Sequence, residues 1–467
     1  MVTQDTAAPL AQALPPAASV VVVGAGYAGL SAALSLQDQG IDVLVLEGSD
    51  RVGGRVLSEE LDGGLIIDHG GQWVGPTQRH LIAAAARFGC PTFPTYDTGD
   101  YLELWQDGVC RPFRGSGPVD GFGVTAYEDA IEQIDTLART IDLDSPTATK
   151  HLEDWDSQTV HSFFASITAD DDVRTRLALS VQGVWTVEPR DISLFHFLFY
   201  VASAGGYEQL METAGCAQDR RFVRGAQSVA LAIAEHLGDR VHVNAPVRQV
   251  DQTGAGVQIR TDRGTVSAHR VVVAAAPGAA VRISFNPPLP ASRNRWMTRN
   301  PMGDVAKVHA VYDTPFWRDQ GLSGQGTVYG DPSVGVVFDN SPAGAECGVL
   351  VAFVYADRLR HWAARPADER RAEVLSTLQK LFGPRAGDPD QYTEKIWTED
   401  PWAFGGYAAN PAPGVWFEHG ATGWRNPCGR IHWAGTETAS VWNGYIDGAI
   451  SSGQRAADEI ATALRGH

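Results

Sequence analysis

The chain has 467 residues and a formal net charge of −18 at pH 7, because 55 acidic side chains outnumber 37 basic ones. A charge of this sign repels phosphate groups, which excludes nucleic acid as a partner and disfavours anionic membrane surfaces. Hydrophobic residues make up 44% of the chain. The composition is that of a globular protein, long enough for about two to three domain-sized cores.

No stretch approaches the ~20 apolar residues that a membrane-spanning helix needs. The first basic side chain is Arg51, so the positive region of a secretory or twin-arginine signal is not expected. The five cysteines are odd in number and scattered, which argues against a disulfide framework and against a zinc site. We therefore expect a soluble, cytoplasmic protein that binds no metal.

The N-terminal part of the chain predicts a tail followed by one βαβ unit. Residues 1–18 are rich in Ala, Pro and Gln without periodicity, and we expect a mobile tail there. Residues 20–23 are four valines, typical of a strand buried on both faces. A helix is expected at 30–39 and a second buried strand at 43–46. Strand, glycine turn, helix and strand within about thirty residues make a complete βαβ unit.

The middle of the chain differs from both ends. Residues 127–210 carry amphipathic helical patterns. The aromatic-rich run at 195–201 is either a buried helix or one wall of a cavity. Further strands are expected at 241–243, 250–259, 270–273, 307–312 and 349–355, and further helices at 370–382 and 448–464.

The predicted fold class is α/β, with a Rossmann-like nucleotide-binding domain that is discontinuous in sequence and an inserted, mixed α+β substrate-binding domain. This organisation follows from the strand-rich segments, which lie at both ends and in the middle. The predicted boundaries are 19–88, 222–294 and 398–467 for the nucleotide-binding domain, and 89–221 and 295–397 for the substrate domain.

The glycine motif after the first strand predicts a dinucleotide site. Gly24, Gly26 and Gly29 follow a strand and open a helix, where glycines permit a tight turn and close approach to a pyrophosphate. Glu47 ends the second strand, 23 residues after Gly24. Its carboxylate is placed to accept hydrogen bonds from ribose hydroxyls.

Three further segments resemble the flavin-containing amine oxidase superfamily, and the monoamine oxidases most. Residues 47–55 resemble its second fingerprint, residues 70–73 the loop that follows, and residues 433–449 the segment that seats the flavin ring at a helix N-terminus. The resemblance implies FAD as the cofactor. The residues that it adds to the glycine motif and Glu47 as FAD-binding are Arg51, Gly53, Gly54, Arg55, Gly71, Gln72, Trp73, Val247, Trp397, Gly435, Thr436, Glu437 and Tyr445.

The resemblance also implies how the flavin is held. Animal monoamine oxidases bond the flavin to a cysteine directly before the first of two active-site tyrosines, and Gly406 stands at that position here. We therefore expect non-covalent FAD. We also expect no counterpart to the membrane tail of the animal enzymes, and a homodimer is a family expectation.

Lys307 is one of four lysines and lies in a predicted strand without a solvated charge face. An ammonium in such a strand is costly unless a partner or a function holds it, although an edge-strand lysine that reaches water is the structural alternative. The surrounding residues resemble the family segment whose lysine holds a water against flavin N5. The implied role of Lys307 is to assist reoxidation of the flavin by oxygen, since a cation stabilises developing superoxide charge.

Tyr407 and Tyr445 match the two tyrosines that the family places in front of the flavin. Their electron-rich ring faces would hold an amine and direct its α C–H toward N5. Met211 and Gln218 fall where the family has a gate residue and a pocket glutamine. No metal ligand set is expected.

The function expected from the sequence is FAD-dependent oxidation of amines. A hydride equivalent passes from the α-carbon to flavin N5, the imine hydrolyses to aldehyde and ammonia, and oxygen is reduced to hydrogen peroxide. An L-amino acid oxidase would need a buried arginine for the substrate carboxylate. A polyamine or diamine oxidase would need a distal carboxylate, for which Glu208 and Glu212 are candidates.

Three other classes explain less of the sequence. A desaturase would not need the paired tyrosines, and a flavin scaffold without activity would have no reason to keep them or Lys307. A nicotinamide dehydrogenase would explain only the first glycine motif.

Overall fold

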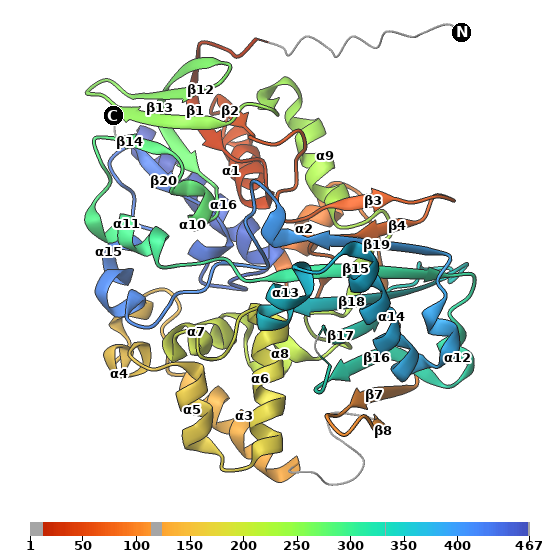
Figure 1. Ribbon diagram of the computed structural model, residues 1–467. Coiled ribbons are helices and arrows are strands. Elements are labelled where there is room, and N and C mark those ends of the chain that lie inside the picture. The colour runs from red at the N-terminus through yellow and green to blue at the C-terminus, as the bar shows by residue number, and fades with distance from the viewer. Residues whose placement is uncertain (1–12, 114–123, 332, 466–467) are drawn as a thin grey trace, which may run out of the picture.

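The computed structural model describes residues 13–113, 124–331 and 333–465 of the chain (Figure 1). Residues 1–12 of the predicted tail lie outside the described residues. The first strand, β1 (Ala17–Val23), begins just before the tail was expected to end.

The first sheet has eight strands and contains the predicted βαβ unit (Figure 1). Its parallel part runs in the order β10 (Val241–His242), β2 (Val43–Leu46), β1, β13 (Gly264–Val273) and β20 (Ile431–Trp433). The sheet continues from β13 through β12 (Val257–Thr261) and β11 (Val247–Gln252) to β14 (Ser284–Asn286).

The prediction of one strand over 250–259 is wrong. β11 and β12 pair antiparallel, and Thr253 donates its N–H to the carbonyl of Gly256 at 2.8 Å across the turn between them. The stretch 254–256 is Gly-Ala-Gly. A side chain is excluded at Gly256, since a Cβ there would come within 2.4 Å of the Ala268 carbonyl oxygen.

The valines of β1 are buried on both faces, as expected for a central strand. Val20 and Val22 pack into the cluster formed with α1 (Tyr27–Asp38), α9 (Gln227–Leu237) and α16 (Ile446–Arg465). Val21 and Val23 pack on the opposite face, with residues of β11 to β13. α16 lies directly on α1, since a Cβ at Gly453 would come within 2.1 Å of the carbonyl oxygen of Ala28.

The second sheet has seven strands and carries Lys307 (Figure 1). Side chains alternate along its strand β15 (Val305–Tyr312). Ala306, Val308 and Ala310 pack in a cluster with α14 (Ala367–Phe382), whereas Val305 packs in another cluster with the aromatic side chains of the opposite face. All eight residues of β15 are buried, so the expectation that neither face is solvated is correct. The strand order is β19 (Gln391–Ile396), β15, β18 (Gly348–Tyr355), β17 (Val334–Asp339), β16 (Leu322–Val328), β7 (Asp100–Leu104) and β8 (Cys110–Phe113).

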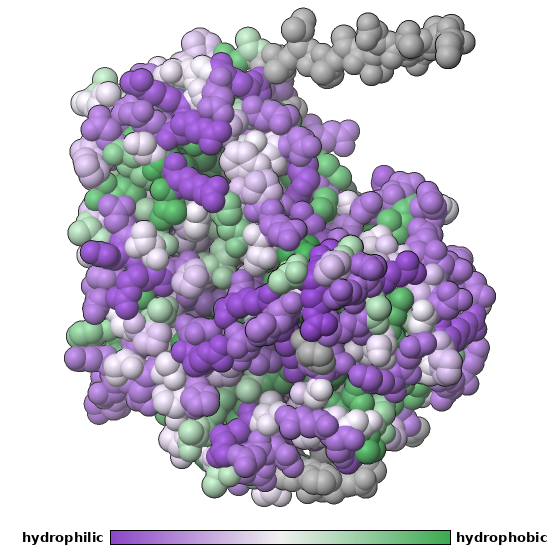
Figure 2. Space-filling model, viewed as in Figure 1, coloured by the Kyte–Doolittle hydropathy of each residue, from purple (hydrophilic) through white to green (hydrophobic). Residues whose placement is uncertain are grey.

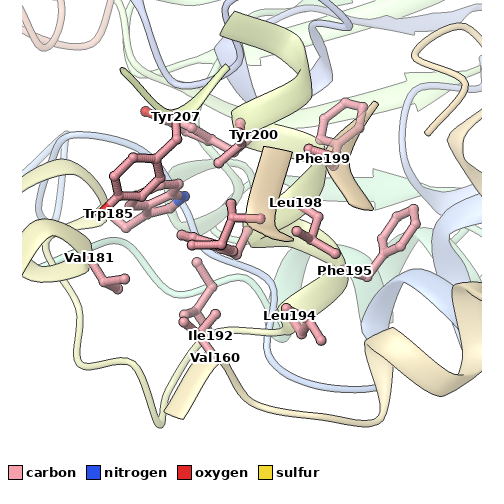
Figure 3. Close-up of a cluster of buried hydrophobic side chains, with 14 of the residues drawn as sticks. Val160, Val181, Trp185, Ile192, Leu194, Phe195, Leu198, Phe199, Tyr200 and Tyr207 are labelled. Atoms are coloured by element: carbon pink, nitrogen blue, oxygen red, sulfur yellow. The ribbon is translucent and has the colours of Figure 1, made fainter. Parts of the chain in front are cut away.

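A helical layer supplies the third part of the molecule. Its helices are α3 (Val124–Ala138), α4 (Leu152–Asp156), α5 (Val160–Ile167), α6 (Asp171–Trp185), α7 (Leu194–Ala204) and α8 (Tyr207–Met211). The aromatic-rich run at 195–201 is the buried helix α7, whose side chains fill the cluster drawn in Figure 3. One of them, Tyr200, also lines the cavity described below, so both interpretations of this run are correct.

The remaining elements are shorter or lie at the periphery. They are β3 (Ser58–Glu60), β4 (Ile66–Asp68), β5 (Trp73–Val74), α2 (Arg79–Arg87), β6 (Thr92–Pro94), β9 (Arg220–Phe222), α10 (Pro277–Ala280), α11 (Ala291–Thr298), α12 (Phe316–Asp319), α13 (Ala356–Ala363), α14 (Ala367–Phe382) and α15 (Ala421–Gly423).

Hydrophilic side chains predominate on the face shown in Figure 2. Among the helices of the described residues, none combines the length and the apolar character needed to cross a membrane.

Candidate active site

A cavity of about 1700 Å³ extends from the glycine loop after β1 to the two predicted tyrosines. Lys307, Tyr407, Tyr445, Met211 and Gln218 all line it. Of the predicted cofactor residues, all line it except Gly29, which lies below the glycine loop, and Glu437, which contacts Arg55. The structure therefore brings residues from both ends and the middle of the chain to one space.

The glycine loop has the geometry that the motif predicts. Gly24 has a φ of +103°, which favours glycine, and a Cβ there would come within 2.9 Å of the Ala274 carbonyl oxygen. A Cβ at Gly29 would lie 1.9 Å from the Gly24 carbonyl oxygen, so α1 packs against the loop only without a side chain there. The N-terminus of α1 thus opens directly into the cavity.

Glu47 and Arg51 are held by the backbone around them. The Glu47 carboxylate accepts hydrogen bonds from the N–H groups of Ala25 at 2.6 Å and Ser49 at 2.8 Å. The Arg51 guanidinium donates to the carbonyls of Gly54 at 2.8 Å and Val56 at 3.0 Å. These bonds fix the fingerprint loop beside the glycine loop.

Arg55 joins three segments that are far apart in sequence. Its guanidinium donates to both carboxylate oxygens of Glu437, at 2.6 and 3.1 Å, and to the Tyr407 carbonyl at 2.8 Å. Burial would raise the pKa of Glu437, but the charge and hydrogen bonds of Arg55 outweigh it and the pKa is lowered. Glu437 therefore stays ionised and holds the Tyr407 segment against the fingerprint loop.

Lys307 is 2% exposed and has three acceptors around its ammonium. Nζ donates to the carbonyls of Asp68 at 2.6 Å and Gly70 at 2.9 Å, and to Oε1 of Gln72 at 2.5 Å. Burial lowers the pKa of Lys307 to about 7, while the charge of Asp68 opposes this effect. Lys307 is thus a buried group that can change its charge near neutral pH.

In the loop 68–70, which Lys307 contacts, each of the three backbone carbonyls accepts a side-chain hydrogen bond. The His69 carbonyl, between the two acceptors of Lys307, accepts from Nε1 of Trp397 at 2.7 Å. Trp73 and Phe353 stack over one another with ring centroids 6.0 Å apart, and Nζ of Lys307 lies 5.8 and 5.4 Å from these rings. The ammonium therefore lies close to two aromatic rings in addition to its three oxygen acceptors.

Tyr407 and Tyr445 are each packed by other aromatic rings. The Tyr407 ring lies 6.3 Å from Phe353, edge to face, and the Tyr445 ring lies 5.9 Å from Tyr200 and 4.8 Å from Trp442. Burial raises the pKa of both phenols above the usual value of 10. Both phenols are therefore neutral at physiological pH, and both residues line the cavity.

Comparison with known proteins decides the family. The family model of the flavin-containing amine oxidoreductases matches residues 27–461. The chain belongs to this family. It is 40% identical to the Mycobacterium tuberculosis protein AofH, which is named as a flavin-containing monoamine oxidase, over 95% of this chain and 97% of that protein. It is 34% identical to amine oxidase B of Sus scrofa, over 95% of this chain and 86% of the relative.

Solved structures of amine oxidases have the same fold. Putrescine oxidase bound to putrescine superposes with a TM-score of 0.92 at 34% identity, over 95% of this chain and 99% of that one. Cyclohexylamine oxidase from Brevibacterium oxydans superposes with a TM-score of 0.92 at 33% identity, over 96% and 100%. The predicted fold class is confirmed: this amine oxidase has a Rossmann-like FAD-binding part and a substrate-binding part.

The residues of this amine oxidase fit FAD. The glycine loop, the N-terminus of α1 and Glu47 would hold a dinucleotide, and side chains at Gly24 or Gly29 would collide with backbone. At the other end of the cavity Nε1 of Trp73 is buried without a partner among the described residues. Tyr445 directly precedes α16, whose N-terminus favours negative charge. FAD is the cofactor of the chain, and oxidation of amines is its reaction.

The far end of the cavity holds side chains that the sequence did not single out. Arg176 of α6 donates to both oxygens of Glu103, at 2.6 and 2.9 Å, and both side chains are less than a tenth exposed. Asp97 lines the cavity near Glu212, and burial raises the pKa of both carboxyls. An ion pair between distant residues, such as Arg176 and Glu103, leaves no pattern in the sequence. The two carboxyls of Asp97 and Glu212 suit a cationic substrate.

Two predicted pocket residues lie at this end as well. Nε2 of Gln218 donates to the Leu210 carbonyl at 3.1 Å, and its Oε1 is buried without a partner among the described residues. Met211 is the last residue of α8. Within the described ranges, no group of three or more His, Cys, Asp or Glu side chains is arranged to hold a metal ion.

Proposed function

We propose that the chain oxidises primary amines with an apolar body, at the site between Tyr407 and Tyr445. The observation that carries this proposal is the shared cavity: the dinucleotide cradle, the two tyrosines and Lys307 line one continuous space. When bound, FAD accepts the hydride equivalent from the amine α-carbon and passes the electrons to oxygen. The imine then hydrolyses to aldehyde and ammonia, and oxygen becomes hydrogen peroxide.

The tyrosines bind and orient the amine. Their neutral rings offer negative π faces to an amine nitrogen and restrict it to one plane. The surrounding aromatic walls exclude water, so the site selects the unprotonated amine. Lys307, held by three oxygens, supplies the positive charge that stabilises electron transfer to oxygen.

The proposal includes non-covalent FAD. Gly406 stands where a covalent link would need a thiol. Precipitation of the protein with acid should leave all flavin in the supernatant. A yellow pellet would show that another residue bonds the cofactor.

An amino acid substrate receives less support from the site. A substrate carboxylate requires a cationic partner, and Arg176 is the arginine of the distal cavity. Its guanidinium is already paired with both oxygens of Glu103. The charge of Arg176 is therefore neutralised before a substrate enters.

A diamine is the second candidate substrate, because two carboxyl groups line the distal cavity. Burial is the largest cause that raises the pKa of each carboxyl; the charges of Glu208 and Asp97 add to it at Glu212, and that of Asp219 at Asp97, so a second ammonium would relieve both. Glu208, the other candidate from the sequence, is exposed but also lines the cavity. The variant Glu212→Gln should raise the KM for a diamine at least tenfold and leave the KM for a monoamine unchanged.

The compartment and the assembly belong to the same proposal. Five unpaired cysteines suit a reducing cytoplasm, where thiols stay reduced. Oxygen is the proposed electron acceptor, and a homodimer stays a family expectation that gel filtration would test.

The test of the function is anaerobic reduction of the flavin. Purified protein is mixed without oxygen with arylalkylamines, diamines and amino acids, and the visible absorption is followed. Bleaching by amines but not by amino acids is expected, and bleaching by amino acids alone would overturn the proposal.

A matched pair of variants tests the tyrosines in the same assay. Tyr445→Ala should slow bleaching about 100-fold or more, because a positioned ring contributes several kcal/mol. Tyr445→Phe keeps the ring face and should stay within about tenfold of the parent. Equal rates for the two variants would refute the role of the ring.

A further inference from the structure

The third acceptor of Lys307 differs from the other two in kind. The carbonyls of Asp68 and Gly70 are part of the backbone, which cannot turn a donor toward the ammonium. Gln72 presents an amide, whose rotation by half a turn would replace Oε1 with an NH₂ group. An NH₂ group facing an ammonium places donor against donor. Something must therefore fix the orientation of the Gln72 amide.

A hydrogen-bond chain from Arg221 fixes this orientation. Nη1 of Arg221 donates to Oδ1 of Asn340 at 2.6 Å, and Nε2 of Gln72 donates to the same oxygen at 2.9 Å. A guanidinium has donors only, so Asn340 must turn its oxygen toward Arg221. Because that oxygen then faces Gln72, the Gln72 amide meets it with NH₂ and turns Oε1 toward Lys307.

Arg221 itself is anchored independently of Asn340's side chain. It donates to the backbone carbonyls of Asn340, at 2.8 Å, and of Ser341. Its guanidinium lies 4.8 Å from the centre of the Phe93 ring, and Arg221 as a whole is 7% exposed. Burial lowers the pKa of Arg221 to about 10, so it is a cation at neutral pH.

We propose that Asn340 and Arg221 are positioning residues of this amine oxidase, which orient the Gln72 amide so that its oxygen holds the Lys307 ammonium. The inference rests on the proposed role of Lys307 in flavin reoxidation. Asn340 follows β17 and Arg221 lies in β9. The hydrogen bond between these two side chains therefore joins the second sheet to the three-stranded sheet of β5, β9 and β6.

Removal of the Asn340 side chain should lower the pKa of Lys307. With the Gln72 amide free to rotate, the ammonium loses an assured acceptor, and its charged form becomes less stable. The charged and titratable groups around Lys307 are Asp68, which favours its charge, Arg221, which disfavours it, the histidines His69 and His309, and Lys395, its cross-strand neighbour on β19. All of these remain when only the Asn340 side chain is changed.

The test compares Asn340→Leu in two backgrounds. In the natural background, the pH below which reoxidation is fast should shift down by about one unit, a tenfold change in the protonation constant. In the Gln72→Met background there is no amide to orient, so Asn340→Leu should cause no shift. Comparison within each background cancels the loss of the third acceptor of Lys307.

A second readout does not depend on turnover. The midpoint reduction potential of the bound flavin, measured at equilibrium, should fall in Asn340→Leu. In this variant a smaller fraction of Lys307 is protonated, and its positive charge therefore stabilises the reduced flavin less. Asn300→Leu is the control, since Asn300 is an equally buried amide whose Nδ2 donates to the Trp296 carbonyl. Asn340→Ala, a smaller change, replaces Asn340→Leu if the latter does not fold.

The outcomes separate this inference from the proposed function. Unchanged pH profile and potential in Asn340→Leu, or an equal shift in both backgrounds, would overturn the inference. The rate of flavin reoxidation is also measured in Lys307→Met. A normal rate in this variant would refute the proposed role of Lys307, and with it the inference. A change in Lys307→Met without one in Asn340→Leu refutes the positioning device alone.

Discussion

Replacement of Lys307 by methionine should change how stability depends on pH. Methionine has a similar length but neither charge nor donor. Lys307 is 2% exposed, and burial lowers its pKa from 10.5 to about 7, with Asp68 opposing this effect. Between these two values the unfolded chain binds the proton and the folded chain does not. The wild-type free energy of unfolding should therefore rise with pH, relative to the variant, from pH 7 to pH 10.5.

The magnitude follows from the size of the shift. One pKa unit corresponds to ~1.4 kcal/mol, so between pH 7 and pH 9.5 the difference between the two proteins should grow by about 3 kcal/mol in favour of the wild type. Below pH 7 the difference should be constant, because Lys307 is protonated in both states. The sign is opposite to that of a surface lysine stabilised by a partner.

Urea unfolding of both FAD-saturated proteins, from pH 6 to pH 9.5 in half-unit steps, measures this difference. Tyrosines and cysteines titrate in both proteins and cancel. Lys150→Met removes an exposed lysine and controls for the loss of one charge. A difference that stays flat across the range would show that the three oxygens keep Lys307 charged throughout and that burial does not dominate.

Three other substitutions test the structure. His309→Leu should raise the free energy of unfolding by about 1–3 kcal/mol, because the imidazole is fully buried and neither ring nitrogen has a partner among the described residues; a loss of stability in thermal denaturation would contradict this. Gly29→Ala should abolish FAD binding in a fluorescence titration, since its Cβ would lie 1.9 Å from the Gly24 carbonyl oxygen. Arg176→Met should cost about 3–5 kcal/mol by leaving Glu103 buried without its partner. Adding Glu103→Gln should recover most of that loss, and no recovery would refute the pairing.

The sequence predicted those parts of the site that depend on local pattern. Gly24 and Gly29 are constrained by a turn and a helix contact within a few residues, and the motif records both. The alternation around Lys307 predicted its burial for the same reason, because a strand places every second side chain on one face. The family resemblance added Tyr407 and Tyr445, which indeed line one cavity with Lys307.

The parts that the sequence did not predict depend on contacts between distant segments. Asn340 lies 268 residues from Gln72, and Arg176 lies 73 residues from Glu103. No periodicity links such positions, and a buried amide or ion pair is specified only by the packing of separate sheets and helices around it. The strand prediction over 250–259 failed for a local reason, since the chain turns at 253–256 and β11 pairs antiparallel with β12.

The Arg55 contacts have a consequence for how the enzyme is made. Arg55 reaches partners 352 and 382 residues further along the chain, at Tyr407 and Glu437. During synthesis the fingerprint loop therefore emerges long before the residues that clamp it. A nascent chain that has folded only its N-terminal strands lacks one whole side of the cofactor cradle. We therefore expect flavin to bind stably only after the segment that carries Tyr407 and Glu437 has been synthesised.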